Sequence, residues 1–490
     1  MKRELNGFEL LGLNSYSLGL STAAGIFTPV LLPYLVVTFM PVEQKNTYLA
    51  AVRVIGLAVA MLVQPVAGLL SDRCTSRWGR RRPFITFGAL GSALAMVFIG
   101  LSPNYLGSAA DAVSRAALGI SLAYVALVAG SMVLHFFSNI AQGAQQALIP
   151  DLVPKRQRGR ASGVKAALEL LAVFLVLLAG PLVDRGQIMA VVGIITAGYL
   201  LTMLATDLFV KEDRLRERPA GGVREPVLRL TALTVIFVGI TQMAIRLVNF
   251  SGGKLTGMGA SPALKVGLLG LAGLAAMAGS ILVGVYLGAW VGIGAEARRQ
   301  RSFIWWVINR LLFLAAVGSI QGFTQYYLRD VIRAPNPASA TAQLLAVVGA
   351  FLVSSALAGG VLADRFGRKR MVALAGWIAA AGALALLTAR SPLQVTVSGA
   401  ILGLATGCFM ATNWALGTDL VPPGEAGRYL GISNLAGAGA GIVGAGIGGP
   451  LADFFNRIQP GLGYEVIFSI YGMLFLISIL VLAQIREPGK

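Results

Sequence analysis

Apolar runs of about twenty residues alternate along the whole chain with short polar loops. A run of this length lets an α-helix cross a hydrocarbon core about 30 Å thick, so the pattern predicts an all-α polytopic membrane protein. In the first part of the chain the predicted spans cover 12–38, 48–70, 84–103, 119–148, 161–183 and 188–209. In the last part they cover 303–328, 341–363, 371–389, 393–418, 427–452 and 465–485.

Two further candidate spans, 230–250 and 266–293, lie in the middle of the chain, and Arg246 interrupts the first of them. The segment 210–229 before them and Arg298–Arg301 after them are both strongly basic, so both belong on the cytoplasmic side. An even number of crossings must then separate them. We expect about fourteen transmembrane helices with both termini cytoplasmic; the alternative is twelve spans with 230–293 lying at the membrane interface.

The composition fits a membrane protein, because only 12% of the residues are charged and 56% are hydrophobic. Soluble domains carry about 25% charged residues. The net charge of +19 comes from basic clusters in alternate loops, which is the positive-inside pattern and does not indicate nucleic-acid binding. These clusters are Arg73–Arg82, Lys155–Arg160, Lys211–Arg229, Arg298–Arg301 and Arg365–Arg370.

Three short blocks occur twice, in the same order. The first runs from Gly68 to Arg82 and returns from Gly360 to Arg370. The second is Asp151-Leu-Val-Pro154, then four residues and Gly-Arg; it returns from Asp419 to Arg428. The third is Gly180-Pro-Leu-Val-Asp184, echoed by Gly449-Pro-Leu-Ala-Asp453. Two similar membrane-spanning halves are typical of alternating-access transporters. We expect a six-helix bundle at 1–209, a cytoplasmic linker at 210–229, an extra hairpin at 230–301 and a second six-helix bundle at 302–490.

The first duplicated block has the chemistry of a conformational latch. A small residue allows close helix packing, an aspartate ends the helix, a glycine permits a tight turn, and arginines can bind helix-end carbonyls and acidic groups. Such clusters hold one conformation and break in another; the alternative is a basic loop that only sets topology. The latch residues are Gly68, Asp72, Arg73, Gly79, Arg80, Arg81, Arg82, Gly360, Asp364, Arg365, Gly367 and Arg368.

These duplicated residues resemble the major facilitator superfamily over nearly the whole chain. The loop Ser71–Ile85, with its Cys-Thr-Ser-Arg insertion before the glycine, resembles the sucrose:proton symporters and their glycoside–pentoside–hexuronide relatives. The stretch Asn139–Leu152 resembles the fourth helix of the same group. The resemblance implies a substrate cavity between the two halves near mid-membrane, and coupling to protons or cations.

The chain departs from that group in two ways. The sucrose symporters carry an acidic residue and an arginine on the fourth helix, and here His135 and Gln146 occupy those places. The extra hairpin is the second departure, because a fourteen-helix layout is more familiar among drug exporters and peptide symporters of the superfamily.

Three ionisable residues are candidates for proton coupling. Glu169 lies about eight residues into the fifth span, and Lys165 is one turn earlier on the same face. Glu169 could alternate between the ion pair and a protonated form, or remain a permanent structural pair. His135 is the only histidine, and its side chain suits either a proton relay or hydrogen-bonded packing.

Amide and aromatic side chains on three spans suit a polyhydroxylated ligand, because amides both donate and accept hydrogen bonds. They also suit ordinary hydrogen bonding between helices. Arg310 could bind an anionic group or extend to the interface, as we expect for Arg246. The candidate cavity residues are Asn139, Gln142, Gln146, Arg310, Gln321, Gln325, Asn413 and Trp414.

No catalytic or nucleotide-binding pattern is present, so we expect neither an enzyme nor ATP-driven transport, and no cofactor or metal. The sequence favours a monomeric secondary transporter in a plasma membrane or bacterial inner membrane. Its partners would be a sugar-like solute, a coupling proton or cation and the lipid bilayer, with no nucleic acid. A drug-type proton antiporter is one alternative. A non-transporting protein that delivers pigment or assembles a membrane complex is the other.

Overall fold

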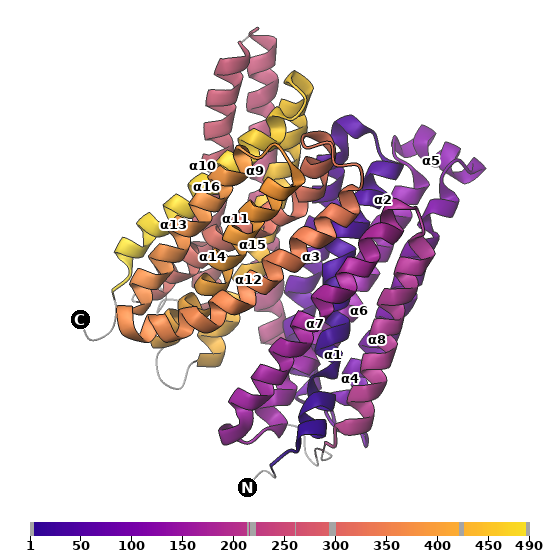
Figure 1. Ribbon diagram of the computed structural model, residues 1–490, viewed down its shortest axis with the longest axis vertical. Coiled ribbons are helices and arrows are strands. Elements are labelled where there is room, and N and C mark those ends of the chain that lie inside the picture. The colour runs from indigo at the N-terminus through magenta and orange to yellow at the C-terminus, as the bar shows by residue number, and fades with distance from the viewer. Residues whose placement is uncertain are drawn as a thin grey trace. The chain divides into compact units, whose positions relative to one another are not determined.

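The computed structural model describes residues 4–212, 215, 222–259, 261–293, 300–420 and 426–486, without the side chains of 155, 292–293 and 426–436. Within these residues fourteen helical segments are long and apolar enough to span a membrane, which confirms the predicted number and the central hairpin. Parts of the predicted linker 210–229 and of Arg298–Arg301 lie outside the described residues. The helices (Figure 1) are α1 (Gly7–Ile26), α2 (Leu32–Phe39), α3 (Lys45–Ser71), α4 (Arg82–Leu101), α5 (Ala109–Leu118), α6 (Leu122–Leu152), α7 (Arg158–Asp184), α8 (Ile188–Phe209), α9 (Arg224–Gly257), α10 (Pro262–Ile293), α11 (Arg301–Asp330), α12 (Pro337–Phe366), α13 (Arg368–Leu387), α14 (Pro392–Asp419), α15 (Ala426–Ile458) and α16 (Leu462–Val481).

The first span, predicted as one helix over 12–38, contains a π-helical turn at Phe27–Leu31 between α1 and α2. Pro29 and Pro33 lack backbone N–H groups and cannot complete the ordinary helical pattern. The Leu32 N–H instead donates to the Phe27 carbonyl, five residues back. The predicted span is therefore one helical segment with a local change of pitch, and it is long and apolar enough to cross once.

Several helices begin where the sequence supplies a cap. Asn6 and Glu9 form a reciprocal capping box at α1, and Ser121 and Ser391 accept from the first turns of α6 and α14. Proline occupies the first turn of α4, α12 and α14, where a missing N–H costs nothing. Local chemistry thus favours helix starts at these positions.

The short helix α5, in the loop between α4 and α6, was not predicted. Its buried Asp111 accepts hydrogen bonds from the Ser121 hydroxyl and the Leu122 N–H, both at 2.7 Å, and from the Gly107 N–H at 3.0 Å. Arg115 completes the set with an ion pair one turn away. One carboxylate therefore holds both ends of the loop.

The chain folds into two compact units. Unit 1 comprises Met1–Met40 and Val59–Leu230, and unit 2 comprises Pro41–Ala58 and Thr231–Lys490. In unit 1, α1 packs on α7 and α8, and α4 packs on α6 and α8. In unit 2, α14 packs on α12 and α13, and α11 packs on α15 and α16. Helix α3 contributes its first half to unit 2 and its second half to unit 1.

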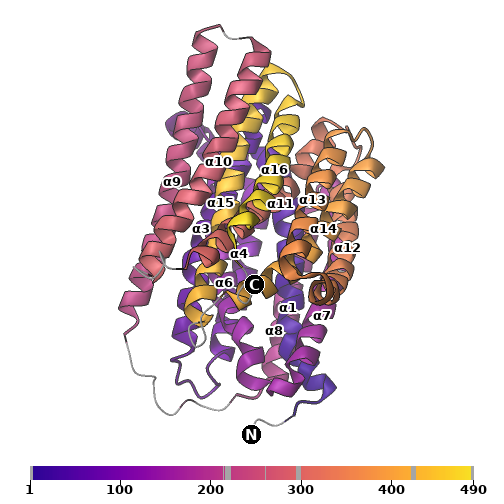
Figure 2. The ribbon, with the colours of Figure 1, turned by 90° about the vertical axis from the view of Figure 1, so that its left-hand side faces the viewer.

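The hairpin α9–α10 belongs to unit 2, where α10 packs along α15 and also contacts α16 (Figure 2). The ring of Phe237 on α9 reaches α10, where a Cβ added at Gly284 would meet it. Both helices are longer than predicted, because helix continues beyond each apolar stretch into polar flanks.

The tightest packing in unit 2 is that of α12 against α14. A Cβ added at Gly407 would overlap the carbonyl oxygen of Leu352, and one at Gly403 would meet that of Val348. Small residues let helix backbones approach in this way in the absence of a hydrophobic driving force between helices.

We expect Gly407→Ala to lower the stability of unit 2 by about 1–3 kcal/mol, because the added methyl must push the two backbones apart. Thermal unfolding in detergent micelles measures this. Gly279→Ala in α10 is the control, since a Cβ there meets nothing within 4 Å and should leave the melting temperature unchanged or raise it. Equal effects of the two variants would contradict the packing argument.

We also expect Asp111→Asn to lower the melting temperature at neutral pH. The hydrogen bond from Ser121, with those from Gly107, Arg115 and Leu122, holds the pKa of the Asp111 carboxyl well below its ordinary value. A depressed pKa stabilises the fold above the pKa of the unfolded chain, about 3.9, and this contribution is lost as the pH falls through the folded pKa. The difference between wild type and variant should therefore shrink below about pH 4; a constant difference would show that the charge is not responsible.

Candidate functional site

The first latch block, Gly68–Arg82, closes around the side chain of Arg81 at one end of unit 1. This guanidinium is only 4% exposed and forms ion pairs with Asp72 and, at 2.7 Å, with Asp151 at the end of α6. It also donates to the Ser71 hydroxyl and to the Gly68 carbonyl at the end of α3. Arg81 therefore joins α3, α4 and α6 through a single buried cation.

The backbone of the same block is held by Glu212, which follows α8. Its Oε2 accepts the N–H groups of Arg81 and Arg82, at 2.9 and 3.0 Å, where α4 begins. Gly79 has a φ of 102°, and a Cβ there would overlap the Glu212 carboxylate. Burial raises the pKa of the Glu212 carboxyl, and the two backbone hydrogen bonds and the neighbouring arginines oppose this shift.

The remaining arginines of the first latch block reach other helices. Arg80 pairs with Asp151 at 3.0 Å. Arg82 lies 3.7 Å from Asp207 of α8, which also accepts from the Thr86 hydroxyl. Arg73 follows α3 and is half-buried. Sequence reasoning included none of the acidic partners Asp151, Asp207 and Glu212 among the site residues, although Asp151 opens the second duplicated block.

The second latch block, Gly360–Arg370, forms a reduced version of this arrangement in unit 2. Arg368 pairs with Asp419 and donates to the Ala415 carbonyl at the end of α14. Gly367, with a φ of 90°, separates α12 from α13. Asp364 and Arg365 are exposed and make no ion pair with another described residue, in contrast to Asp72. Gly360 lies on an exposed face of α12.

In both units an arginine of the latch block thus binds the aspartate that opens the Asp-Leu-Val-Pro block. Arg80 and Arg81 bind Asp151, and Arg368 binds Asp419. The pairing between the two blocks is thus present in both units. Of the rest of the second copy, Pro422 and the side chain of Arg428 lie outside the described residues.

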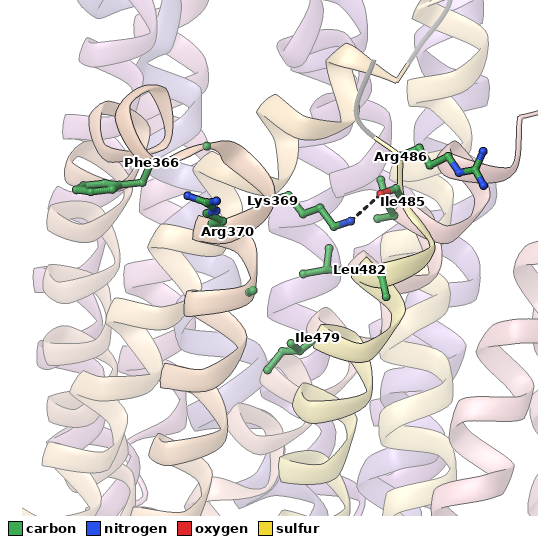
Figure 3. A pocket seen from close by; sticks show the side chains of 10 residues that line it. Phe366, Lys369, Arg370, Ile479, Leu482, Ile485 and Arg486 are labelled. Atoms are coloured by element: carbon green, nitrogen blue, oxygen red, sulfur yellow. Dashed lines mark hydrogen bonds between the residues drawn. The ribbon is translucent and has the colours of Figure 1, made fainter. Parts of the chain in front are cut away.

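A cavity of about 610 Å³ lies beside the second latch block (Figure 3). Lys369 reaches across from α13 and donates to the Ile485 carbonyl at 2.8 Å, beyond the end of α16. Arg370 and Arg486 lie on its walls, and Ile479 and Leu482 form an apolar floor. These contacts fasten the last described residues to α13.

Three candidate cavity residues of unit 2, Arg310, Asn413 and Trp414, belong to a polar cluster in which α11 meets α14. Asn413 donates to Asn309 Oδ1 at 2.8 Å and accepts from Arg310 at 3.2 Å, while Trp306 Nε1 donates to its carbonyl at 2.8 Å. The Arg310 guanidinium lies over the Trp414 ring at 5.1 Å and the Trp306 ring at 6.0 Å. Trp306 was not among the predicted cavity residues.

Arg310 is 7% exposed, and it has no carboxylate partner among the described residues. Arg310 donates to the Asn413 side chain, while the Nε of Arg310 is buried and has no hydrogen-bond partner among the described residues. A buried guanidinium with an unused donor beside two indole rings can bind the hydroxyl or carboxylate oxygens of a small ligand.

The other predicted residues of α11 lie elsewhere. Gln321 and Gln325 are 11 and 15 residues beyond Arg310, about 16 and 22 Å along the helix. Gln321 lines a separate, mainly apolar cavity of about 60 Å³ together with Thr324 and Thr406. Gln325 is buried, and its Oε1 has no hydrogen-bond partner among the described residues.

In unit 1 the predicted residues share one face of α6, with spacings of four, three and four residues from His135 to Asn139, Gln142 and Gln146. Asn139 donates to the His135 carbonyl at 2.7 Å. The side chains of Gln142 and Gln146 form no hydrogen bond with described residues. Gln145 is buried and donates to the Ser17 hydroxyl at 2.6 Å.

The predicted ion pair on α7 is present, with Lys165 Nζ 3.7 Å from Glu169 Oε1. The Glu169 side chain is 44% exposed. A paired carboxylate agrees with both interpretations of Glu169, as a coupling residue and as a structural pair.

The family model described as the Major Facilitator Superfamily matches residues 14–328 and 333–490. Sucrose transport protein SUT1 of Oryza sativa subsp. japonica is 38% identical over 112 residues, which are 22% of this chain and 21% of that protein. Sucrose transport protein SUC4 of Arabidopsis thaliana is 30% identical over 149 residues, which are 30% and 28% of the two chains. The matches thus span less than a third of these curated relatives.

Among solved structures, the crystal structure of D-xylose-proton symporter has a TM-score of 0.62 at 16% identity, covering 99% of this chain and 98% of that one. A crystal structure of the nucleoside transporter NupG has a TM-score of 0.63 at 13% identity, covering 98% and 100%. At this identity the likeness concerns the fold alone.

We expect Arg81→Ala to destabilise unit 1 by about 3 kcal/mol, since it leaves the carboxylates of Asp72 and Asp151 without their buried cation. Thermal unfolding of the purified protein measures the effect. Arg77→Ala in the same loop is the matched control, because Arg77 is exposed and forms no ion pair with a described residue. If Arg77→Ala proved as damaging as Arg81→Ala, the block would be a general basic loop.

Proposed function

This chain belongs to the Major Facilitator Superfamily, and we propose on that basis that it is a secondary active transporter for a sugar or glycoside, working by alternating access and coupled to protons or cations. The observation that carries the proposal is the Arg310–Asn413 cluster, where a buried cation and two amides lie beside indole rings. Hydroxyl groups of a sugar match these donors and acceptors, and an apolar sugar face matches the rings.

The names of the curated relatives support a sugar over the other two alternatives, a drug or an assembly partner. We propose that the protein is a monomer in a plasma membrane or bacterial inner membrane, with both termini cytoplasmic. Both latch blocks would then lie on the cytoplasmic side, and the loop before α3 on the opposite side. Glu169 and His135 remain proposed residues for the coupling proton.

We expect Arg310→Gln to reduce the uptake of labelled sugar by about tenfold or more, because a charge-assisted hydrogen bond contributes about 1.5 kcal/mol or more to binding. Proteoliposomes with a panel of mono- and disaccharides measure it. Arg246→Gln is the matched control, since Arg246 is also a span arginine but is exposed on α9. A well-folded wild type that moves no sugar of the panel would overturn the sugar assignment.

Glu169→Gln tests the proposed coupling residue. With a pH-sensitive dye inside the proteoliposomes, sugar-dependent acidification should disappear in Glu169→Gln while sugar exchange without a gradient remains, because exchange needs no net proton movement. Acidification that survives the substitution would leave Glu169 as a structural partner of Lys165.

A further inference from the structure

The first turn of α3 is bound to α15 by one buried carboxylate of unit 2, Asp453, which is 3% exposed. Asp453 Oδ1 accepts from the Asn46 N–H at 3.2 Å and from Asn46 Nδ2 at 2.8 Å. Its Oδ2 accepts from the Thr47 N–H at 2.7 Å and from the Thr47 hydroxyl at 2.6 Å. Four donors on a carboxylate at a helix N-terminus favour the ionised form.

A second carboxylate completes the network. Asp330, at the end of α11, forms an ion pair with Lys45, which is also buried, and accepts from the Tyr464 hydroxyl at 2.6 Å. Asn46 Nδ2 lies 3.5 Å from that hydroxyl and so connects the two carboxylates. We call Lys45, Asn46, Thr47, Asp330, Asp453 and Tyr464 the α3 cluster.

The α3 cluster holds two carboxylates and one ammonium group, so it is one proton short of neutrality. The other charged groups nearby do not supply it. Arg457 is exposed, and its Nε donates to the main-chain oxygen of Asp453 at 3.3 Å. Arg53 lies eight residues beyond Lys45, about 12 Å along α3, and donates to the Gly318 carbonyl. Glu43 before α3, Arg329 on α11 and Glu465 on α16 are exposed.

An acceptor for the missing proton is already present. Asn46 is fully buried, and its Oδ1 has no hydrogen-bond partner among the described residues. If its amide rotates, Oδ1 can accept the O–H of a protonated Asp453. That rotation removes the hydrogen bond from Asn46 Nδ2, and protonation weakens the bonds from Thr47.

We propose that Asp453 is a further proton-binding site, separate from Glu169 and His135, and that proton binding there releases the first turn of α3 from α15. A proton from water adds to the Asp453 carboxylate, and the charge of the α3 cluster becomes neutral. Because the docked helix favours the ionised carboxylate, binding of the proton and docking of α3 oppose each other by linkage. The part of this proton in transport rests on the proposed function, while the proton site itself rests on these contacts.

The test follows the docking of α3 and needs no sugar. Ala50 is buried on α3, close to Gly449 of α15: a Cβ added at Gly449 would meet the Ala50 side chain. In a chain with Cys74→Ser and Cys408→Ser, the rate at which Ala50→Cys reacts with a maleimide is divided at each pH by the rate of the same chain when unfolded, because only the thiolate reacts. This normalised labelling should rise as the pH falls, with the slope of a single proton. With Asp453→Asn added, the normalised labelling should be high and independent of pH; with Glu465→Gln added it should follow the parent.

Thr47→Val provides the second variant in case Asp453→Asn does not fold. It keeps the carboxylate but removes one donor, so the midpoint of the labelling curve should move to higher pH. Labelling that ignores pH in the parent, that keeps its pH dependence in Asp453→Asn, or whose midpoint does not move in Thr47→Val would overturn the proposal. If labelling behaves as expected but no sugar moves protons in the proteoliposome assay, the proton site stands and the transport proposal fails.

Discussion

A charge that is kept from water needs a partner of opposite sign or a full set of hydrogen bonds, and the described structure is organised around this constraint. In unit 1 the buried guanidinium of Arg81 pairs with two carboxylates and donates to two further oxygen atoms, and three helix ends meet there. In unit 2 the buried carboxylate of Asp453 receives four donors from α3. These two clusters determine which helices are joined at their ends.

The duplicated blocks keep the same partners but not the same environment. The Arg81 side chain is almost fully buried, so breaking its pairs leaves uncompensated charges. Arg368 and Asp419 are both substantially exposed, and such pairs contribute about 0–1 kcal/mol. The connection between the two blocks is therefore present in both units, and the difference in burial makes it strong in unit 1 and weak in unit 2.

Arg310 is the exception to the constraint, because it forms no ion pair with a described carboxylate. Its Nε also has no hydrogen-bond partner among the described residues. Asn413 and two indole rings hold the guanidinium in place. An unsatisfied buried donor is costly to the fold, and a ligand oxygen would remove that cost. Asn46 Oδ1 in the α3 cluster is likewise buried without a hydrogen-bond partner among the described residues.

The sequence by itself determined the membrane class, the fourteen spans and the pairing of similar halves, since these follow from apolar length, basic loops and repeated residues. It also identified Arg81, Arg310 and Asn413 as residues to examine. Only the tertiary structure decided their partners. Glu212, Asp207 and Asp453 lie far along the chain from the groups they bind, and no local pattern marks such a meeting. Helix α3 shows the reason most clearly: its sequence predicts one span, but tertiary packing divides that span between two units, because a buried carboxylate on α15 holds its first turn.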